Sequence, residues 1–452
     1  MSYSQISLPL RAVALGMVAT FLTISNPSTA VGATPVTPST RDSFLVVDTF
    51  TLDDGRKVET VELPGLRCFQ PNVQFAGIDA HDERFVNGEW GNHEFVFALP
   101  KDYSGGSFPV FLNLRGGGFG WVDTTVPLDQ VTPDLYGVSW GQVRGPGVHF
   151  NFGLLSTQWW TRKHAYTSFT HEPLEEVPGA AGSPSRFLSQ LRDRFPAWGI
   201  LFPSYCSRDA YYGRGERGMD GVRYGYEAVI RALDYVEHHH GIDVLVVGGT
   251  SAGGLGAGVI ARDLQKDRPD IDLLGAIVDS GPAEVAAYGR VKDEGVVGGL
   301  RRVQVGEDKQ TWVQCDHPLQ NTTRGLDTIN FLDFSLSEAI EDGTITTPIF
   351  HAWNSRDSVI SCGDLAFGQE HLEGAIARAI EEHNPGGASV NYEKCGGTTR
   401  ACTAEAPTPI GECPDSQVVE IPCSGHGVLS GGPNVADALD WMEKLLEQKS
   451  AE

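Results

Sequence analysis

The sequence predicts a mixed α/β fold in which a central, mostly parallel sheet is flanked by helices. Short apolar runs alternate with stretches of helical periodicity over most of the chain, a pattern typical of parallel strands joined by helices. The run at residues 244–247 is apolar throughout, as expected for a strand whose two faces are both covered. A length of 452 residues fits one large domain with insertions.

The individual elements follow from the same two periodicities. Apolar runs bounded by turn residues predict strands at residues 110–114, 200–202, 244–247, 273–278, 348–351 and 417–421. Apolar residues at helical spacing predict helices at residues 224–238, 372–382 and 434–449. The first of these helices is expected to stop near Gly241, because glycine commonly follows a helix end.

Charge and cysteine content exclude several classes of function. The formal net charge of −24 repels phosphate backbones, so nucleic acid is not an expected partner.

Eight cysteines, an even number, predict disulfides if the chain is exported, although the pairing cannot be deduced from the sequence. No CxxC pair occurs, and adjacent histidines at 238–240 point to different sides of a helix. We therefore expect no metal site.

The strongest chemical signal is a G-x-S-x-G motif centred on Ser251. It spans Gly249 to Gly253, directly after the apolar run at 244–247 and before a predicted helix. A serine on a sharp strand-to-helix turn is the nucleophile elbow of the α/β-hydrolase fold. The following helix would direct its first N–H groups at the site and favour negative charge there. The sequence therefore predicts an α/β-hydrolase fold with Ser251 as its nucleophile.

A glycine cluster after an early strand predicts an oxyanion hole. Residues 116–118 are all glycine and follow the strand at 110–114, where this fold builds half of its oxyanion hole. The backbone amide of Ala252 is expected to supply the other donor. No Gly-Lys-Ser/Thr follows the cluster, which excludes a phosphate-binding P-loop.

The base that activates Ser251 is expected to be His426. A serine hydroxyl needs a base, and this fold places its triad in the chain order serine, acid, histidine. The histidines after the nucleophile are at 317, 351, 371, 383 and 426. His426 follows the last predicted strand in a loop between two glycines. The others sit on predicted helix ends, lack a preceding strand or, for His351, precede the expected acid.

Two aspartates remain candidates for the triad acid. Asp357 follows the predicted strand at 348–351, and Asp279 follows the strand before it. The order of elements favours Asp357, but hydrolases that use the earlier strand keep Asp279 open.

The chain is predicted to contain an export signal and one catalytic domain. Residues 1–33 are the expected signal peptide, since Arg11 precedes an apolar run and small residues; an uncleaved anchor is the alternative. Residues 34–42 are rich in Pro, Thr and Ser and form the expected disordered leader. Residues 43–452 are the expected catalytic domain. Within it, residues 121–198 break the alternation and are interpreted as loop insertions over the active site, with ordinary surface loops as the alternative. The predicted signal peptide implies a secreted or periplasmic protein with no membrane attachment after cleavage.

Three segments resemble those of the pectin acetylesterase and Notum family. They are Gly-Thr-Ser-Ala-Gly-Gly around Ser251, Leu-Arg-Gly-Gly-Gly at 114–118 and Pro-Ser-Tyr-Cys-Ser-Arg-Asp at 203–209. Arg115 stands where the family carries Glu, Phe119 stands where it carries Trp, and Ser204 is an additional residue. These departures put the acyl pocket, and so the substrate, in doubt.

The resemblance implies hydrolysis of carboxylic esters by a Ser-Asp-His triad without a metal or organic cofactor. It assigns the nucleophile to Ser251, the acid to Asp357 and the base to His426. It assigns the oxyanion donors to the amides of Gly117, Gly118 or Phe119, together with Ala252.

The expected substrate is a small-molecule or polysaccharide ester with a short acyl group, such as acetyl on pectin. The alternatives are a lipid esterase for longer acyl chains, a serine peptidase and a secreted protein that binds without catalysis. Oligomeric state is not predicted by the sequence.

Overall fold

A computed structural model describes most of the predicted catalytic domain. The residues that it describes are 44–69, 90–116, 120–122, 136–138, 186–205, 209–214, 224–281, 299–304, 310–315, 334–353, 369–392, 398–402, 418–422, 428–431 and 435–451. The predicted signal peptide and leader, and most of the predicted insertion at 121–198, lie outside these residues.

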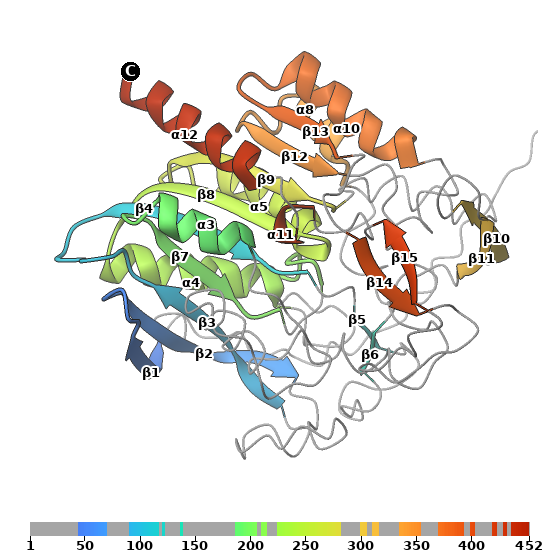
Figure 1. Ribbon diagram of the computed structural model, residues 1–452. Coiled ribbons are helices and arrows are strands. Elements are labelled where there is room, and N and C mark those ends of the chain that lie inside the picture. Colours follow the sequence, from blue (N-terminus) through green and yellow to red (C-terminus); the bar gives the residue numbers. More distant parts are fainter. Residues whose placement is uncertain are drawn as a thin grey trace, which may run out of the picture. The chain divides into compact units, whose positions relative to one another are not determined.

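The described core is built on a nine-stranded sheet, with strands in the order β1-β2-β3-β7-β4-β8-β9-β12-β13 (Figure 1). Its strands are β1 (Leu45–Thr51), β2 (Lys57–Phe69), β3 (Trp90–Ala98), β4 (Phe108–Leu114), β7 (Gly199–Pro203), β8 (Ile242–Thr250), β9 (Leu273–Asp279), β12 (Ile349–Trp353) and β13 (Ala388–Asn391). The strands β7, β4, β8, β9, β12 and β13 are mutually parallel. At one edge of the sheet, β1, β2 and β3 pair antiparallel, and β3 is also antiparallel to β7. The sheet is therefore mostly parallel, as the sequence predicts.

Three further strand pairs lie outside this sheet in the described residues. They are β5 (Gly120–Val122) with β6 (Tyr136–Val138), β10 (Gly299–Gln304) with β11 (Gln310–Cys315), and β14 (Thr398–Cys402) with β15 (Val418–Pro422). Each pair is antiparallel.

Helices cover both faces of the nine-stranded sheet. They are α3 (Arg186–Arg194), α4 (Gly225–His239), α5 (Ala252–Asp267), α8 (Leu336–Glu341), α10 (Gln369–His383), α11 (Val428–Gly431) and α12 (Val435–Ala451). Buried side chains of α4, α5, α8 and α10 share one apolar cluster, and those of α3, α11 and α12 share another. The molecule thus has a three-layer arrangement of helix, sheet and helix.

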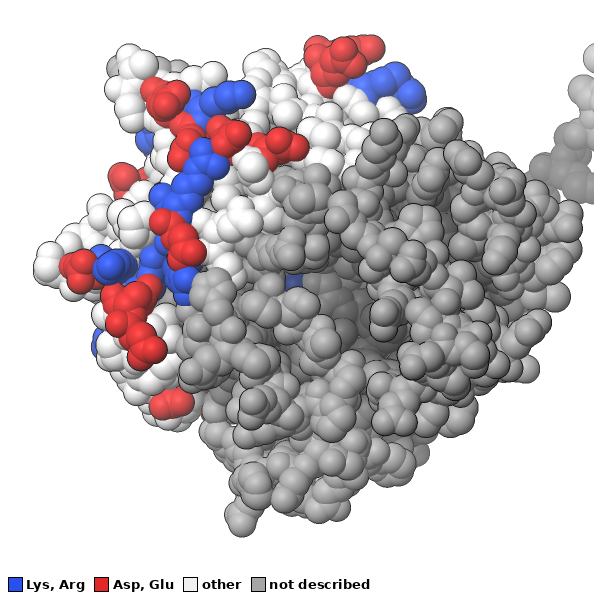
Figure 2. Space-filling view, viewed as in Figure 1, with Lys and Arg blue, Asp and Glu red and all other residues white. Residues whose placement is uncertain are grey.

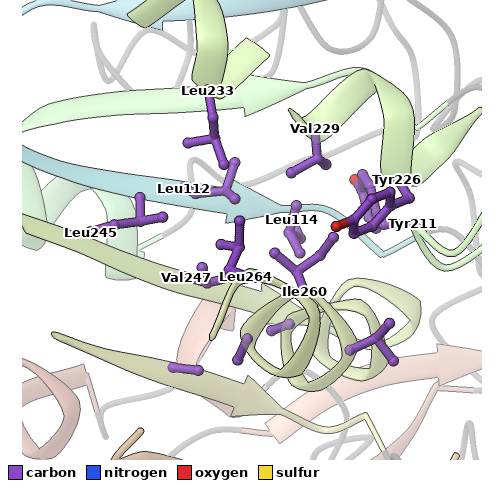
Figure 3. Packing of buried hydrophobic residues seen from close by; sticks show 14 of the residues in the cluster. Leu112, Leu114, Tyr211, Tyr226, Val229, Leu233, Leu245, Val247, Ile260 and Leu264 are labelled. Atoms are coloured by element: carbon purple, nitrogen blue, oxygen red, sulfur yellow. The ribbon is translucent and has the colours of Figure 1, made fainter. Parts of the chain in front are cut away.

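The alternation of side chains along the central strands explains the two clusters. In β4, Leu112 joins the cluster of α4 and α5, whereas Phe111 joins the cluster of α3 and α12. In β8, Leu245 and Val246 divide in the same way, because successive residues of a strand point to opposite faces. Figure 3 shows Leu112 and Leu245 packed with residues of the neighbouring helices, including Leu233. Both faces of these strands are buried, so apolar residues occupy every position from 244 to 247.

The strand at 417–421 is not the last strand of the main sheet. The structure has β15 there, but β15 pairs with β14 in a separate two-stranded sheet. The last strand of the main sheet is β13, which the sequence analysis missed. Its four residues, Ala-Ser-Val-Asn, carry too little apolar periodicity to identify a strand.

On the face shown in Figure 2, acidic and basic side chains alternate over α3 and α12, where Arg194 lies against both Asp440 and Glu443. Among the described residues, no helix is both long enough and apolar enough to cross a membrane.

Candidate active site

Ser251 occupies a sharp turn between the end of β8 and the start of α5. Its backbone has φ of 60° and ψ of −126°, a combination that non-glycine residues rarely adopt. Its N–H donates to the carbonyl of Asp279 at 2.8 Å, and its own carbonyl accepts from the N–H of Leu255 at 3.1 Å. Hydrogen bonds on both sides therefore hold the strained residue in place, and its side chain stays half-buried.

The glycines two before and two after the serine are required by close backbone contacts. A Cβ on Gly249 would lie 2.1 Å from the carbonyl oxygen of Gly253. A Cβ on Gly253 would lie 2.1 Å from the carbonyl oxygen of Leu114 in β4. Any larger residue at either position would push the turn away from the neighbouring strand. The G-x-S-x-G spacing is thus a direct consequence of how tightly β8 turns into α5.

This turn stands at the carboxyl end of a central strand, where parallel α/β sheets place their ligands. The strand is flanked by β4 and β9, both parallel to it. A strained serine on a sharp turn between a strand and a helix at this position is the nucleophile elbow, which is characteristic of the α/β-hydrolase fold. The chain has the α/β-hydrolase fold.

One group that could stabilise an oxyanion, the N–H of Ala252, adjoins Ser251, and the glycine cluster begins beside it. Ala252 is the first residue of the 16-residue helix α5, so its N–H is one of the four that have no acceptor inside the helix. Gly116 follows β4, and a Cβ there would lie 2.7 Å from the Cβ of Ser251 and 2.6 Å from the carbonyl oxygen of Thr250. The glycine cluster therefore begins in direct contact with the serine.

The residue before Gly116 carries a positive charge. Arg115 is half-buried, and burial lowers the pKa of its guanidinium to about 9, so the side chain stays charged at neutral pH. A cation thus stands beside the glycine cluster, at the position where the resembling family carries a glutamate.

Asp279 ends β9 and is tied to the serine turn on one side. Its side chain is only 1% exposed. One carboxylate oxygen accepts from the hydroxyl of Thr250 at 2.9 Å, and the other accepts from the hydroxyl of Ser280 at 3.0 Å. Together with the bond from its carbonyl to the Ser251 N–H, these contacts make Asp279 part of the frame of the nucleophile turn.

Asp279 and Ser280 also hold the start of α11. The N–H of Leu429 donates to the Asp279 carboxylate at 3.3 Å, and the N–H of Val428 donates to the Ser280 hydroxyl at 3.4 Å. Val428 is two residues after His426. The segment that follows the predicted base is therefore hydrogen-bonded to the end of β9, and the N–H of Ser251 is hydrogen-bonded to the same strand end.

The structure places some of the predicted site residues and leaves others outside its description. Ser251 and Ala252 lie together, and the alternative acid Asp279 lies beside them. The predicted acid Asp357, the predicted base His426 and the predicted oxyanion residues Gly117, Gly118 and Phe119 all lie outside the described residues. The rejected His351 is fully buried in β12, and its Nδ1 is 3.0 Å from the hydroxyl of Ser389.

Two supporting residues were missed by the sequence analysis. Tyr211 contacts the backbone of Arg115 through its hydroxyl, and Asp209 holds the turn that carries Tyr211. Asp209 belongs to the Pro-Ser-Tyr-Cys-Ser-Arg-Asp segment, which drew attention only as a resemblance. The signal available was an aspartate followed by Ala-Tyr-Tyr-Gly, since aspartate commonly accepts backbone N–H groups two residues on.

The predicted disulfides and the predicted absence of a metal are not decided by the described residues. Cys206, Cys362, Cys395, Cys413 and Cys423 lie outside them. Among the described residues, no group of three or more His, Cys, Asp or Glu side chains is arranged to hold a metal ion.

Comparison with known proteins gives matches among solved structures alone. No family model matches the chain, and no curated protein sequence matches it. The chain is similar to esterase B from Lactobacillus rhamnosis, with 11% identity over 89% of this chain and 91% of that one and a TM-score of 0.38.

Two further similar structures are also esterases. The rice cell wall degrading esterase LipA from Xanthomonas oryzae has 10% identity over 90% of this chain and 98% of that one, with a TM-score of 0.37. Est1E from Butyrivibrio proteoclasticus has 9% identity over 80% of this chain and 96% of that one, with a TM-score of 0.35. The sheet order and the Ser251 turn identify the fold independently of these distant matches.

Proposed function

We propose that the chain is a secreted serine carboxylesterase that hydrolyses short acyl esters through an acyl-enzyme on Ser251. The observation that carries this proposal is the strained turn at Ser251, with the first N–H groups of α5 on one side and Gly116 on the other. Backbone strain of this kind persists where the surrounding structure enforces it, and it is common at catalytic residues.

The proposed base is His426, and the anchoring of α11 supports it. His426 precedes Val428, the first residue of α11, by only two residues in the sequence. Val428 and Leu429 are hydrogen-bonded to Ser280 and Asp279, and Asp279 is bonded to the N–H of Ser251. This chain of hydrogen bonds between α11 and the serine turn supports His426 as the proposed base.

The proposed acid is Asp357, with Asp279 as the alternative. Asp357 follows β12 by four residues, whereas Asp279 already accepts hydrogen bonds from Thr250, Ser280 and Leu429. These bonds support a structural role for Asp279. We therefore assign Asp357 as the carboxylate that orients His426.

In the proposed reaction, His426 takes the hydroxyl proton while the Ser251 oxygen attacks the ester carbonyl carbon. The amide of Ala252 and those of the glycine cluster, Gly117, Gly118 or Phe119, would bind the oxyanion. When the tetrahedral intermediate collapses, the bond to the alcohol breaks and His426 returns the proton to it. Water, activated by the same histidine, then releases the acid and restores the serine. No cofactor is required.

The substrate proposal is narrower and rests on the sequence. The resemblance to the pectin acetylesterase and Notum family favours an acetyl ester, on pectin or another polysaccharide. A lipid carboxylester with a longer acyl chain is the alternative within the same chemistry. The export signal predicted at residues 1–33 supports a reaction outside the cytoplasm.

The test is hydrolysis of p-nitrophenyl acetate and p-nitrophenyl octanoate by the mature protein and by Ser251→Ala. We expect the wild type to hydrolyse the acetate faster, and the variant to lose about 10⁶-fold in kcat, as other serine hydrolases do. Faster hydrolysis of the octanoate would favour the lipid esterase. Equal activity in both proteins, or none in either, would refute the proposed nucleophile and favour a binding protein.

A further inference from the structure

The hydroxyl of Tyr211 binds both backbone groups of Arg115. It accepts from the Arg115 N–H at 2.8 Å and donates to the Arg115 carbonyl at 3.2 Å. Arg115 directly follows Leu114, the last residue of β4. A single buried hydroxyl thus contacts both backbone groups of the first residue after the strand.

The residue held in this way leads directly into the catalytic turn. Gly116 follows Arg115 and contacts Ser251 and Thr250 so closely that even a methyl group would not fit. The first turn of α5 packs against the same segment, since a Cβ on Gly253 would lie 2.7 Å from the carbonyl carbon of Arg115. The backbone at 115–116 is therefore enclosed between Tyr211 on one side and the serine turn on the other.

Tyr211 is itself held in a strained conformation. Ala210 and Tyr211 both have positive φ, of 50° and 63°, which costs free energy for residues with a Cβ. The buried carboxylate of Asp209 enforces this turn by accepting from the N–H groups of Tyr211, Gly213 and Gly225 at 2.9 to 3.0 Å. Two successive strained residues, stabilised by a buried charge, indicate that the position of the Tyr211 ring matters to the molecule.

The surroundings of Tyr211 fix its ring and keep its proton. The ring of Tyr205 stacks on it with centroids 4.8 Å apart, and the Tyr205 hydroxyl accepts from the Ala210 N–H at 2.9 Å. Tyr211 is fully buried, and this burial raises the pKa of its hydroxyl. The group therefore stays protonated through the neutral range and can donate and accept at the same time. Figure 3 shows Tyr211 within the cluster of buried residues that includes Leu114 and Tyr226.

We propose that Tyr211 is a positioning residue that sets the backbone of Arg115 and Gly116 against Ser251, and so aligns the start of the oxyanion loop. This inference rests on the proposed esterase function. An oxyanion donor stabilises the transition state only when it lies within hydrogen-bond range of the developing charge. A small shift of the segment that carries it lowers kcat without weakening substrate binding to the same degree.

The variant that tests this is Tyr211→Phe, which keeps the ring and removes the hydroxyl. We expect kcat for p-nitrophenyl acetate to fall by about 10- to 100-fold, because one oxyanion donor is worth about 10²–10³ in kcat and its loss here is partial. KM is expected to stay within about threefold, since the change acts on the transition state. Tyr235→Phe is the matched control, because it also removes the hydroxyl of a buried tyrosine, in this case one that is hydrogen-bonded to Glu59 at 2.9 Å.

Hydrogen exchange gives a readout that does not depend on activity. The Arg115 N–H is the group that Tyr211 protects, so its exchange in native buffer is expected to accelerate by about tenfold or more in Tyr211→Phe. Exchange at Arg115 in Tyr235→Phe is expected to match the wild type. Tyr205→Phe, which loosens the turn but keeps the Tyr211 hydroxyl, is expected to show a smaller change in the same direction and serves if Tyr211→Phe does not fold.

Each outcome decides one of the two proposals. Accelerated exchange together with the selective fall in kcat supports the positioning role. Unchanged exchange at Arg115, or accelerated exchange with unchanged kcat, overturns it while the esterase function stands. A wild-type protein that hydrolyses no ester refutes the esterase function, and with it the catalytic part of this role, even if the exchange result shows that Tyr211 holds the loop.

Discussion

Ser251 is held at its turn in a strained backbone conformation. A non-glycine residue held outside the common regions of φ and ψ costs on the order of 1–3 kcal/mol. Bonds from Ser251 to Asp279 and Leu255 and the close approach of Gly249 and Gly253 hold it there. Every part of this arrangement except Asp279 lies within seven consecutive residues of the sequence. The motif could therefore be recognised from sequence alone.

The two candidate acids are expected to respond differently to removal of their charge. Asp357→Asn is expected to lower kcat by about 10⁴-fold with little loss of stability, as happens when a triad acid no longer orients its histidine. Asp279→Asn places an amide among donor groups from Thr250, Ser280 and Leu429. We expect it to cost about 1–3 kcal/mol of stability and less than about tenfold in kcat.

The measurement is kcat for p-nitrophenyl acetate beside urea unfolding of each variant, with the wild type as reference. If Asp279→Asn abolished activity while Asp357→Asn stayed near the wild type, the acid would be Asp279 and the assignment to Asp357 would be wrong.

At the scale of elements, local pattern predicted those that carry a strong periodicity. The structure has α4, α10 and α12 within a few residues of the predicted helices, and β8 contains the apolar run at 244–247. The pairing of strands is harder to predict from the sequence, because it is decided by residues that are far apart in the chain. The strand at 417–421 exists, but whether it joins β13 or β14 depends on contacts that its own residues do not encode.

Helix α12 is expected to be one of the elements on which stability depends most. Trp441 is 6% exposed, packs against Phe350 with centroids 5.5 Å apart and donates its Nε1–H to the Gly386 carbonyl at 2.8 Å. Trp441→Ala is expected to lower the free energy of unfolding by about 3–5 kcal/mol.

Lys444→Ala is the control in the same helix, because Lys444 is exposed and is expected to change stability by less than about 0.5 kcal/mol. Denaturant titration measures both. Similar midpoints for the two variants would contradict the docking of α12 through Trp441.

At the scale of the whole molecule, one buried carboxylate links α4 to the antiparallel edge of the sheet. Glu59 in β2 accepts from the Tyr235 hydroxyl at 2.9 Å and from Lys57 at 2.7 Å, and it lies 3.4 Å from the Nε2 of His240. The close approach of His240, followed by the hydrogen bonds from Lys57 and Tyr235, lowers the pKa of Glu59 from 4.5 to about 2. His240, the last of the three adjacent histidines, is therefore directed toward the interior, where it lies beside Glu59.

This shift predicts a pH dependence of stability. A carboxylate whose pKa is lowered by folding stabilises the protein above its unfolded pKa, and this contribution disappears as the pH falls from about 4.5 to about 2. The contribution at neutral pH is about 1–3 kcal/mol, because solvent screens the interaction with the exposed Lys57. Glu59→Gln is expected to be less stable than the wild type at pH 7, and the difference is expected to shrink toward pH 2. Urea unfolding at several pH values measures this difference, and a constant difference across the range would refute the link to Glu59.

The site as a whole was predictable only where its residues are close in sequence. The serine turn and the glycine cluster each follow a strand directly, so their positions at neighbouring strand ends follow from the fold. The role of Tyr211 was not predictable, because it depends on a contact between residues 96 positions apart. The anchoring of α11 by Asp279 likewise joins segments about 150 residues apart.

Covalent labelling of the mature protein with a fluorophosphonate, followed by peptide mapping, tests the assignment of Ser251 as the nucleophile. Such a reagent reacts with a serine that is activated by a base and placed beside an oxyanion hole. We expect one adduct, on Ser251, which is lost in Ser251→Ala and greatly slowed in His426→Ala. No adduct on the folded protein, or an adduct on a different serine, would contradict the assignment of Ser251 as the nucleophile.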